Sequence, residues 1–334
     1  MTPYLSKLTQ RGREFLGSDL AIMGGAMTWV SERKLVSALS NAGAFGVIAC
    51  GSMNTDLLRA EIKATRALTS KPFGVNLITM HPQLDALIDV CLEEKVSHIV
   101  LAGGLPPAAA IARAKNGGAK VLAFAPALVI ARKLIRSGAD AIVIEGMEAG
   151  GHIGPVSTFV LAQEILPNIT DVPVFVAGGI GRGEGMLAFL EMGAAGVQLG
   201  TRFVCASECI AHANFKKAFL RGAAREAQTS TQIDARFPVI PVRALANDGT
   251  RAFMDKQREV IARFDTGELD QKAAQLEIEH FWAGALRRAV VDGDVETGSV
   301  MAGQSVGLVD KEQSAAEILA ELMNEAEAAL KRRG

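Results

Sequence analysis

The histidine at position 152 lies in a run of small residues, EGMEAGGHIG, that extends from Glu145 to Gly154. Imidazole changes charge close to neutral pH, and glycine neighbours leave it free to reach a ligand, so a histidine in this setting can exchange a proton with a substrate. A packed core histidine is the competing interpretation, but core histidines usually lie inside a helix or a strand. We therefore predict that His152 is a catalytic residue.

The other four histidines have weaker settings. His81 and His98 are predicted to be peripheral, His212 falls in an expected helix, and His280 falls in a charged helical segment. No pair has a zinc-binding spacing such as H-E-x-x-H, and there is no G-x-S-x-G nucleophile motif. We expect reduced thiols and no metal site from the scattered cysteines, Cys50, Cys91, Cys205 and Cys209.

Two further motifs, VAGGIG (176–181) and QLGTRF (198–203), place glycines directly after short apolar runs. Glycine lets backbone N–H groups approach an anion, and a helix that starts nearby adds its dipole. Tight turns alone would also use glycine, but these loops follow the seventh and eighth expected strands, where barrels often bind phosphate. We predict that they hold the phosphate of a cofactor or substrate.

Two amide side chains are candidates for contacts with the rest of such a ligand. Asn76 ends the run FGVN, where its amide could hydrogen-bond an isoalloxazine or a similar ring; a helix N-cap is its alternative role. Gln198 could point inward as a further polar contact. The glycines of GGAMTW, near the start of the chain, do not form the G-x-G-x-x-G of a Rossmann site.

Eight short apolar runs must position these residues, and segments with helical periodicity separate them. Alternating strands and helices predict a parallel sheet, either closed as a barrel or open and doubly wound, and the count of eight favours a (β/α)8 TIM barrel. Proline and threonine start several of the helices, and glycine ends them. The expected strands are residues 20–23, 45–49, 73–77, 98–102, 120–124, 141–145, 174–177 and 196–199.

The pattern changes after Gly200. Residues 201–222 are expected to form the eighth helix, residues 223–247 are polar and turn-prone, and residues 251–291 are charged and helical. An amphipathic helix over 314–331 is expected to complete the barrel. We therefore predict a barrel from residues 1–222 and 292–334, with residues 223–291 as a helical insertion, or lid, after the eighth strand.

Composition limits the class of protein. The 334 residues are 49% hydrophobic and 21% charged, enough apolar residues for a large core. A formal net charge of -1 provides no basic field for nucleic acid. The sequence shows neither a secretory signal nor a run of about 18 apolar residues that could cross a membrane. We expect a cytoplasmic protein with no nucleic-acid or membrane partner.

The motifs together resemble those of the FMN-dependent nitronate monooxygenase family, and within it the flavin-type enoyl-acyl-carrier-protein reductases. The resemblance extends from about Ile22 to Leu308, nearly the whole chain, and EGMEAGGHIG with GSVMAGQ is its most specific part. It implies a (β/α)8 barrel with a helical insertion. The motifs that carry it are GGAMTWV, PFGVN, EGMEAGGHIG, VAGGI, VQLGTRFV and GSVMAGQSVGLV.

The resemblance also implies roles for single residues. His152 matches the active-site histidine of the family, and Asn76 would contact the flavin. Four residues would line the flavin ring: Gly24, Gly25, Ala26 and Met27. Four would hold the FMN phosphate: Gly178, Gly179, Gly200 and Thr201. Four would close over the cofactor from the C-terminal segment: Met301, Ala302, Gly303 and Gln304. The predicted cofactor-binding set is completed by Glu145, Gly151, Ala177 and Gln198.

Three functions follow as expectations. The first is NAD(P)H-dependent reduction of an enoyl thioester by hydride transfer through flavin N5, with a small-molecule or acyl-carrier-bound substrate. The second is oxidation of alkyl nitronates with O2, in which no nicotinamide is needed. The third is a non-catalytic barrel that binds a phosphometabolite. A homodimer is compatible with all three.

Overall fold

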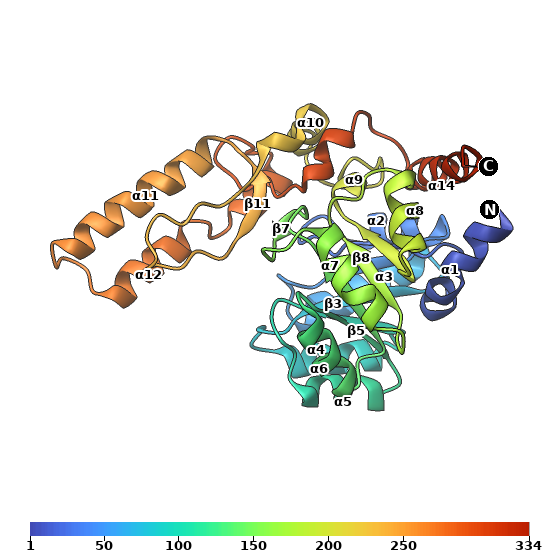
Figure 1. Cartoon of the computed structure of the whole chain (residues 1–334). Helices are drawn as coiled ribbons and strands as arrows, with labels where there is room; N and C mark the ends of the chain where they lie inside the picture. Colours follow the sequence, from blue (N-terminus) through green and yellow to red (C-terminus); the bar gives the residue numbers. More distant parts are fainter. Residues whose placement is uncertain (334) are drawn as a thin grey trace.

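The computed structural model describes residues 1–333 and shows an eight-stranded parallel barrel surrounded by helices (Figure 1). The strand order is β1-β9-β8-β6-β5-β4-β3-β2, and backbone hydrogen bonds between Ile22, Gly24 and Phe45 join the two end strands. The predicted barrel is therefore confirmed. The strands are β1 (Ile22–Gly24), β2 (Gly46–Ala49), β3 (Phe73–Ile78), β4 (His98–Ala102), β5 (Lys120–Phe124), β6 (Ala141–Glu145), β8 (Val174–Ala177) and β9 (Gly196–Leu199).

Helices follow the first seven barrel strands, and local sequence sets their ends. Asn54 caps the helix that follows β2 by accepting a hydrogen bond from the backbone N–H of Leu57, and Asp56 lies in its positive first turn. Gly118 and Gly138 follow helix ends with positive φ, which glycine adopts without steric cost. The helices are α2 (Arg33–Asn41), α3 (Thr55–Leu68), α4 (Leu84–Glu93), α5 (Ala108–Asn116), α6 (Leu128–Arg136), α7 (Thr158–Ile165) and α8 (Gly183–Glu191).

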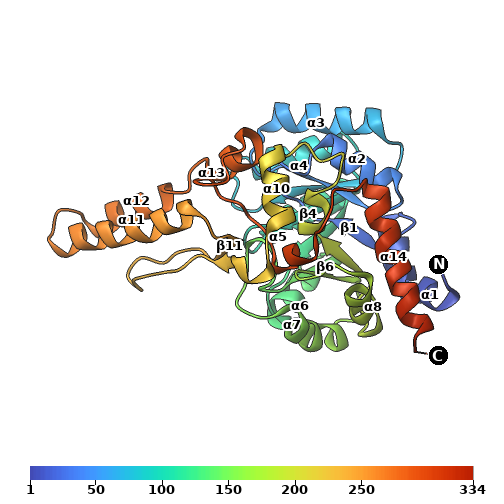
Figure 2. The same ribbon diagram turned by 90° about the horizontal axis from the view of Figure 1, so that it is seen from above.

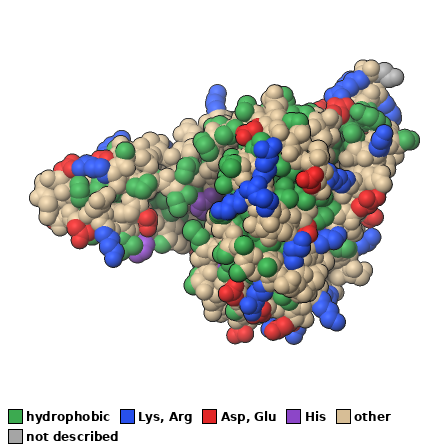
Figure 3. All heavy atoms as spheres, turned by 60° about the horizontal axis from the view of Figure 1, so that its bottom comes forward, with side chains coloured by type: hydrophobic (Ala, Val, Ile, Leu, Met, Phe, Trp, Pro, Cys, Tyr) green, Lys and Arg blue, Asp and Glu red, His purple; other side chains and the backbone are tan. Residues whose placement is uncertain are grey.

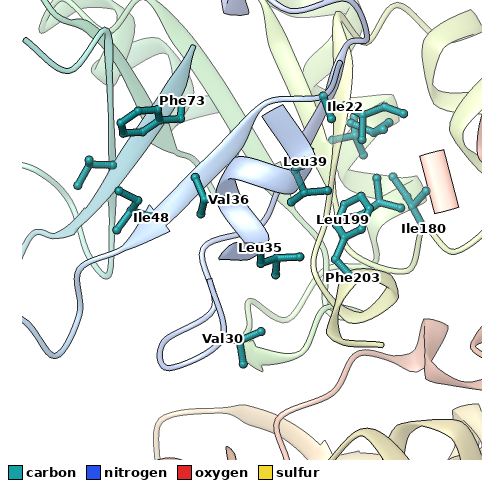
Figure 4. Close-up of a cluster of buried hydrophobic side chains, with 14 of the residues drawn as sticks. Ile22, Val30, Leu35, Val36, Leu39, Ile48, Phe73, Ile180, Leu199 and Phe203 are labelled. Carbon is teal, nitrogen blue, oxygen red and sulfur yellow. The ribbon is translucent and has the colours of Figure 1, made fainter. Parts of the chain in front are cut away.

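Apolar side chains form two layers of core. The outer layer lies between strands and helices, and Figure 4 shows Leu35 and Leu39 of α2 in this layer, among buried side chains such as Ile22. The inner layer fills the barrel itself and includes Phe45 and Phe175. Strands that are buried on both faces read as continuous apolar runs, which is why the sequence located them.

A helix that the sequence analysis did not predict closes the amino-terminal end of the barrel. This helix, α1 (Pro3–Leu16), is capped by Thr2, and its last residues, Phe15 and Leu16, join the inner core. His98 lies here, so its predicted peripheral position is wrong. The ring is 3% exposed, and its Nε2 and Nδ1 atoms lie 2.9 Å from the Phe15 carbonyl oxygen and 2.8 Å from the Ser97 hydroxyl. A histidine at the start of a barrel strand can be buried because a distant helix supplies its partner.

The eighth helix of the barrel comes from the end of the chain. Helix α14 (Ala315–Lys331) packs against α8 and α2, and Arg202 forms an ion pair with Glu321 of α14. The expectation that residues 201–222 form this helix is wrong, because they divide into α9 (Thr201–Val204) and α10 (Ala213–Arg221). After α9, the backbone N–H of Ser207 donates to the carbonyl oxygen of Gln313, which turns the chain away from the barrel.

Residues 230–241 form the expected turn-rich segment, but a short strand that we did not expect lies on each side of it. Strands β10 (Ala227–Thr229) and β11 (Val242–Leu245) pair antiparallel, and β11 pairs with β7 (Gly151–His152), which follows β6. These strands are too short and polar to show an alternating pattern in the sequence. The insertion therefore joins the loop that carries His152 in one three-stranded sheet.

The remaining insertion is an arm of two helices that projects away from the barrel (Figures 1 and 2). Helices α11 (Asp248–Asp265) and α12 (Gln271–His280) have a separate core that includes Phe253 and Val260. Because this core is local, the arm does not need to lie over the barrel, as a lid would. Acidic and basic side chains are interspersed over the barrel and the arm (Figure 3).

Shorter helical segments complete the fold. They are α13 (Ala285–Arg287), the π-helical turn η3 (Arg288–Asp292), and the 3-10 turns η1 (Leu166–Asn168), η2 (Ala224–Glu226) and η4 (Gln304–Leu308). Within residues 1–333, no helix is both long enough and apolar enough to cross a membrane.

Candidate active site

A cavity of about 570 Å³ opens at the carboxyl ends of the barrel strands. Three polar side chains from strands far apart in the sequence line it: Asn76 of β3, Glu145 of β6 and Gln198 of β9. Glu145 and Gln198 are brought together by the register of β6, β8 and β9, in which both pair with Ala177. Their neighbours on the cavity wall, including Val47, Val100 and Phe124, are apolar.

These three groups are poorly satisfied by protein partners. The Asn76 side-chain amide donates to the Val100 carbonyl oxygen over 3.1 Å, and because Asn76 lies within β3 it is not a helix N-cap. Neither Glu145 nor Gln198 makes a side-chain hydrogen bond to another residue of the described chain 1–333. Buried polar groups normally have partners, so this arrangement indicates that a polar ligand supplies them.

The Glu145 carboxyl is a proton donor at neutral pH. Burial raises its pKa from 4.5 to about 8, and no neighbouring cation opposes that shift. A protonated carboxyl can donate one hydrogen bond and accept others. Glu145 can therefore bind a ligand that presents both a carbonyl oxygen and an N–H group.

His152 has the opposite protonation tendency. It lies on β7 and lines the cavity, and the residue is exposed. Partial desolvation of the ring by the cavity wall lowers its pKa below the usual 6.5, so the neutral imidazole predominates at neutral pH. Two groups with pKa values displaced in opposite directions in one cavity are typical of acid and base assignments.

The two glycine loops form one edge of the cavity. Gly178 and Gly179 have φ values of +96° and +73°, and a Cβ atom on Gly178 would lie 3.1 Å from the Gly146 carbonyl oxygen. On the neighbouring loop, the Thr201 hydroxyl accepts a hydrogen bond from the backbone N–H of Gly303 over 2.9 Å. Glycines at this edge leave backbone N–H groups accessible to a ligand, as in a phosphate-binding turn.

Comparison with known proteins identifies the family. The model of the nitronate monooxygenase family matches residues 11–87 and 79–325. The chain belongs to the nitronate monooxygenase family. Members of this family are flavin-dependent oxidoreductases, so the chain is an enzyme.

Relatives within this family have different substrates. The chain is 31% identical to "(3aS,4S,5R,7aS)-5-hydroxy-7a-methyl-1-oxo-octahydro-1H-indene-4-carboxyl-CoA dehydrogenase" of Mycobacterium tuberculosis, over 94% of each chain. It is 32% identical to a nitronate monooxygenase of Paraburkholderia phytofirmans, over 93% of each. The solved structure of FabK from Thermotoga maritima superposes with a TM-score of 0.87 at 36% identity, covering 96% of this chain and 97% of FabK. The family is therefore fixed, and the substrate is not.

Most of the predicted site residues of this family member line the cavity. They are Gly25, Ala26, Met27, Asn76, Glu145, Gly151, His152, Ala177, Gly178, Gly179, Gln198, Gly200, Thr201 and Met301. Gly24 does not, because its position faces α2, where a Cβ atom would lie 2.6 Å from Leu39 Cδ1. Ala302 and Gly303 pack behind Gly150, and Gln304 lines a second hollow of about 540 Å³. The second hollow shares Gly178 and Gly179 with the barrel cavity.

Sequence analysis missed the apolar half of the cavity. Ile130, Ile153, Phe215 and Leu286 line it from four separate segments, and Leu286 is the only described residue of the insertion 223–291 that does so. The strand alternation of β5 could have predicted that Phe124 points into the barrel. The other four residues come together at the cavity only through packing between distant segments. Helices α11 and α12 contribute no residue to the cavity lining.

The cysteines have no place in this site. All four are buried and free, and burial raises the pKa of each thiol. Such thiols are poor nucleophiles.

Proposed function

We propose that this enzyme binds FMN in the barrel cavity and transfers a hydride from NAD(P)H to the carbon–carbon double bond of an enoyl thioester. The observation that carries the proposal is the division of one cavity into a polar floor, a glycine edge and an apolar outer half. A flavin needs the first two features, and an acyl chain needs the third.

The residues present fit FMN. The unpaired Glu145 carboxyl and the Gln198 amide match the alternating donors and acceptors of a flavin's pyrimidine ring, and Asn76 keeps its side-chain oxygen free. The loops at Gly178 and Gly200 would hold the phosphate through backbone N–H groups. When bound, the flavin would supply the chemistry of accepting and donating a hydride.

His152 would act on the substrate. A neutral imidazole has one donor nitrogen, which can hydrogen-bond the thioester carbonyl oxygen and stabilise the negative charge that develops there. The carbon next to that carbonyl group would then take its proton from water, because the N–H of a neutral imidazole is too weak an acid to supply it. Its position on a short strand at the cavity wall leaves it free to approach the substrate.

The relatives support a thioester over other substrates. The M. tuberculosis relative is named as a dehydrogenase of a carboxyl-CoA compound, and FabK is 36% identical to this chain, compared with 32% for the P. phytofirmans nitronate monooxygenase. The outer cavity, with Ile130, Ile153 and Leu286, offers apolar contacts for the carbon chain of such a substrate. An acyl-carrier protein or coenzyme A could each deliver it.

An anaerobic titration tests the proposal. NADH or NADPH should bleach the absorbance of the purified flavoprotein, and crotonyl-CoA or a longer enoyl thioester should restore it. The absence of both changes would reject the proposal. If NAD(P)H reduces the flavin but no enoyl thioester reoxidises it, the protein is a flavin enzyme and the proposed substrate is wrong.

Nitronate oxidation is the second candidate, favoured by the P. phytofirmans relative at 32% identity. A neutral His152 could position the nitro group or act as a base. Oxygen uptake with ethyl nitronate or propionate 3-nitronate, without nicotinamide, would support this activity. No uptake above the rate of free FMN would remove it.

A further inference from the structure

The segment that carries His152 is held by the insertion. Val242 of β11 pairs with His152, Arg243 pairs with Gly151, and the backbone N–H of Ile153 donates to the Pro241 carbonyl oxygen over 3.1 Å. Strand β7 has only two residues, and its one strand partner within residues 1–333 is β11. The position of the histidine therefore depends on residues about 90 positions later in the chain.

Arg243 is the anchor of β11. Its side chain is buried, with 4% of the residue exposed, and it forms no ion pair with a described carboxylate. The Nε atom donates to the Met147 carbonyl oxygen over 2.8 Å, and Nη1 donates to the Ala227 carbonyl oxygen of β10. Burial lowers the pKa of Arg243, while the nearby Glu148 favours the charged form. A buried guanidinium is costly unless such hydrogen bonds compensate it.

These bonds join the His152 loop to the insertion. Met147 is bound to Arg243, whereas the next residue, Glu148, is bound to the barrel: its carboxylate accepts from the backbone N–H and the hydroxyl of Thr158, each over 2.8 Å. The Glu148 carbonyl oxygen accepts from Gln304 over 2.9 Å. Arg243 is thus the one described side chain that links Met147 to β10.

We propose that Arg243 is a positioning residue for His152, and that residues 227–245 form a strap that sets the histidine's place in the cavity. This inference rests on the proposed function, in which His152 acts on the substrate. Arginine suits the role because its planar group directs donors to two carbonyl oxygens at once, whereas lysine is a single flexible point charge. Arg243 itself does not line the cavity.

A double-mutant cycle tests the link to His152. Arg243→Met should lower kcat by about 10- to 100-fold, since displacement of a reacting group by about 1 Å can cost that much. Arg243→Lys, which keeps the charge, should show a smaller loss. In the His152→Ala background, Arg243→Met should cause less than about a twofold further loss, because its effect passes through the missing ring. Equal losses in both backgrounds would overturn the proposal.

The control is Arg251→Met. Arg251 is an exposed arginine of the same insertion, and its ion pair is with Asp248 on its own helix. It should leave kcat and the flavin absorbance unchanged. The melting temperature of each variant shows whether it is folded. If Arg243→Met does not fold, the same double-mutant cycle is carried out with Arg243→Lys.

A second measurement does not depend on turnover. In the flavin-loaded protein with histidine labelled at 13Cε1, the His152 signal is assigned by its loss in His152→Ala. Arg243→Lys should shift or broaden this signal and leave the His98 signal in place, and Arg251→Met should change neither. If no thioester is reduced but the signal moves, the proposed function fails and the strap stands. An unmoved His152 signal in a folded Arg243 variant would overturn the strap.

Discussion

The two ends of the barrel use similar residue types for different purposes. At the amino-terminal end, Phe15 and Leu16 of α1 fill the opening, and both ring nitrogens of His98 have partners within 3 Å. At the carboxyl end, glycines border an open cavity, and neither Glu145 nor His152 has a side-chain hydrogen bond within residues 1–333. Satisfied polar groups stabilise a fold, and unsatisfied ones are available to a ligand.

The two histidines make this difference specific. Burial lowers the pKa of both, to about 4 for His98, so a pKa shift alone does not distinguish them. Their hydrogen bonds do distinguish them: both ring nitrogens of His98 have protein partners, whereas the His152 side chain lines the cavity and has no partner within residues 1–333. The two histidines therefore differ in the hydrogen-bond partners that the protein supplies, and this difference is what makes His152 the candidate for substrate contact.

The largest expected effect comes from His152→Ala. Loss of the hydrogen bond to the negative charge that develops on the thioester oxygen should lower kcat for thioester reduction by about 10²- to 10³-fold, with little change in melting temperature. Stopped-flow reoxidation of the reduced flavin by crotonyl-CoA measures this step. If the flavin of His152→Ala is reoxidised at the wild-type rate, His152 has no role in the reaction, and the proposed difference between the two ends of the barrel is wrong.

The wild-type pH profile should agree with that result. Because the pKa of His152 is lowered, the ring is neutral above about pH 6.5, and kcat/KM should fall only as acid protonates it. His152→Ala should remove this acid limb. If the acid limb of the kcat/KM profile persists in His152→Ala, the limb belongs to a different titrating group.

His98 should govern acid stability instead of activity. Its pKa is about 4 in the folded chain and 6.5 in the unfolded chain, so below pH 6.5 the unfolded chain binds the proton more readily. The free energy of unfolding should therefore fall by up to about 3 kcal/mol between pH 6.5 and pH 4. Urea unfolding across this range measures the fall, and His98→Gln should flatten it. An equally steep fall in His98→Gln would refute this assignment.

Phe15→Ala tests, independently of pH, how much the side chains of α1 that close the amino-terminal end of the barrel contribute to stability. Phe15 contacts His98 and Phe175, with ring centroids 5.3 Å and 6.0 Å apart, and its loss should destabilise the fold by about 2–3 kcal/mol. The flavin content and kcat of the folded protein should be unchanged. Phe159→Ala, at a position 57% exposed on α7, is the matched control and should cost less than about 0.5 kcal/mol. Loss of flavin in Phe15→Ala would contradict the division between the two ends.

The smallest effect is expected for Glu145→Gln. The folded-state pKa of Glu145 is raised to about 8 from 4.5, so the folded chain binds the proton more tightly, and stability decreases as pH rises from 4.5 to 8. Solvent screening in the open cavity reduces the expected decrease in the free energy of unfolding to about 1 kcal/mol, which corresponds to about 2–4 °C in melting temperature. Glu145→Gln should melt higher than wild type at pH 8 and equally at pH 5. A difference that does not change with pH would contradict the assigned protonation.

The sequence predicted the barrel because its strands are buried on both faces and its helices end at glycine, as at Gly118 and Gly138. It located most cavity residues because they follow strands directly. It could not show that Phe15 covers His98, that α14 replaces the eighth helix, or that β11 pairs with the strand that carries His152. Each of these depends on contacts between residues about 80 or more positions apart, which leave no local pattern.

The central claim is that the carboxyl end of the barrel is a flavin site. The most direct measurement is to purify the protein, record its visible spectrum, denature it and identify the released cofactor by mass spectrometry. We predict a yellow protein that releases about one FMN per chain, and a Gly178→Ala variant that retains much less, because a Cβ atom there would crowd the Gly146 carbonyl oxygen. A folded, colourless protein that takes up no added FMN would contradict the account and favour a non-catalytic barrel.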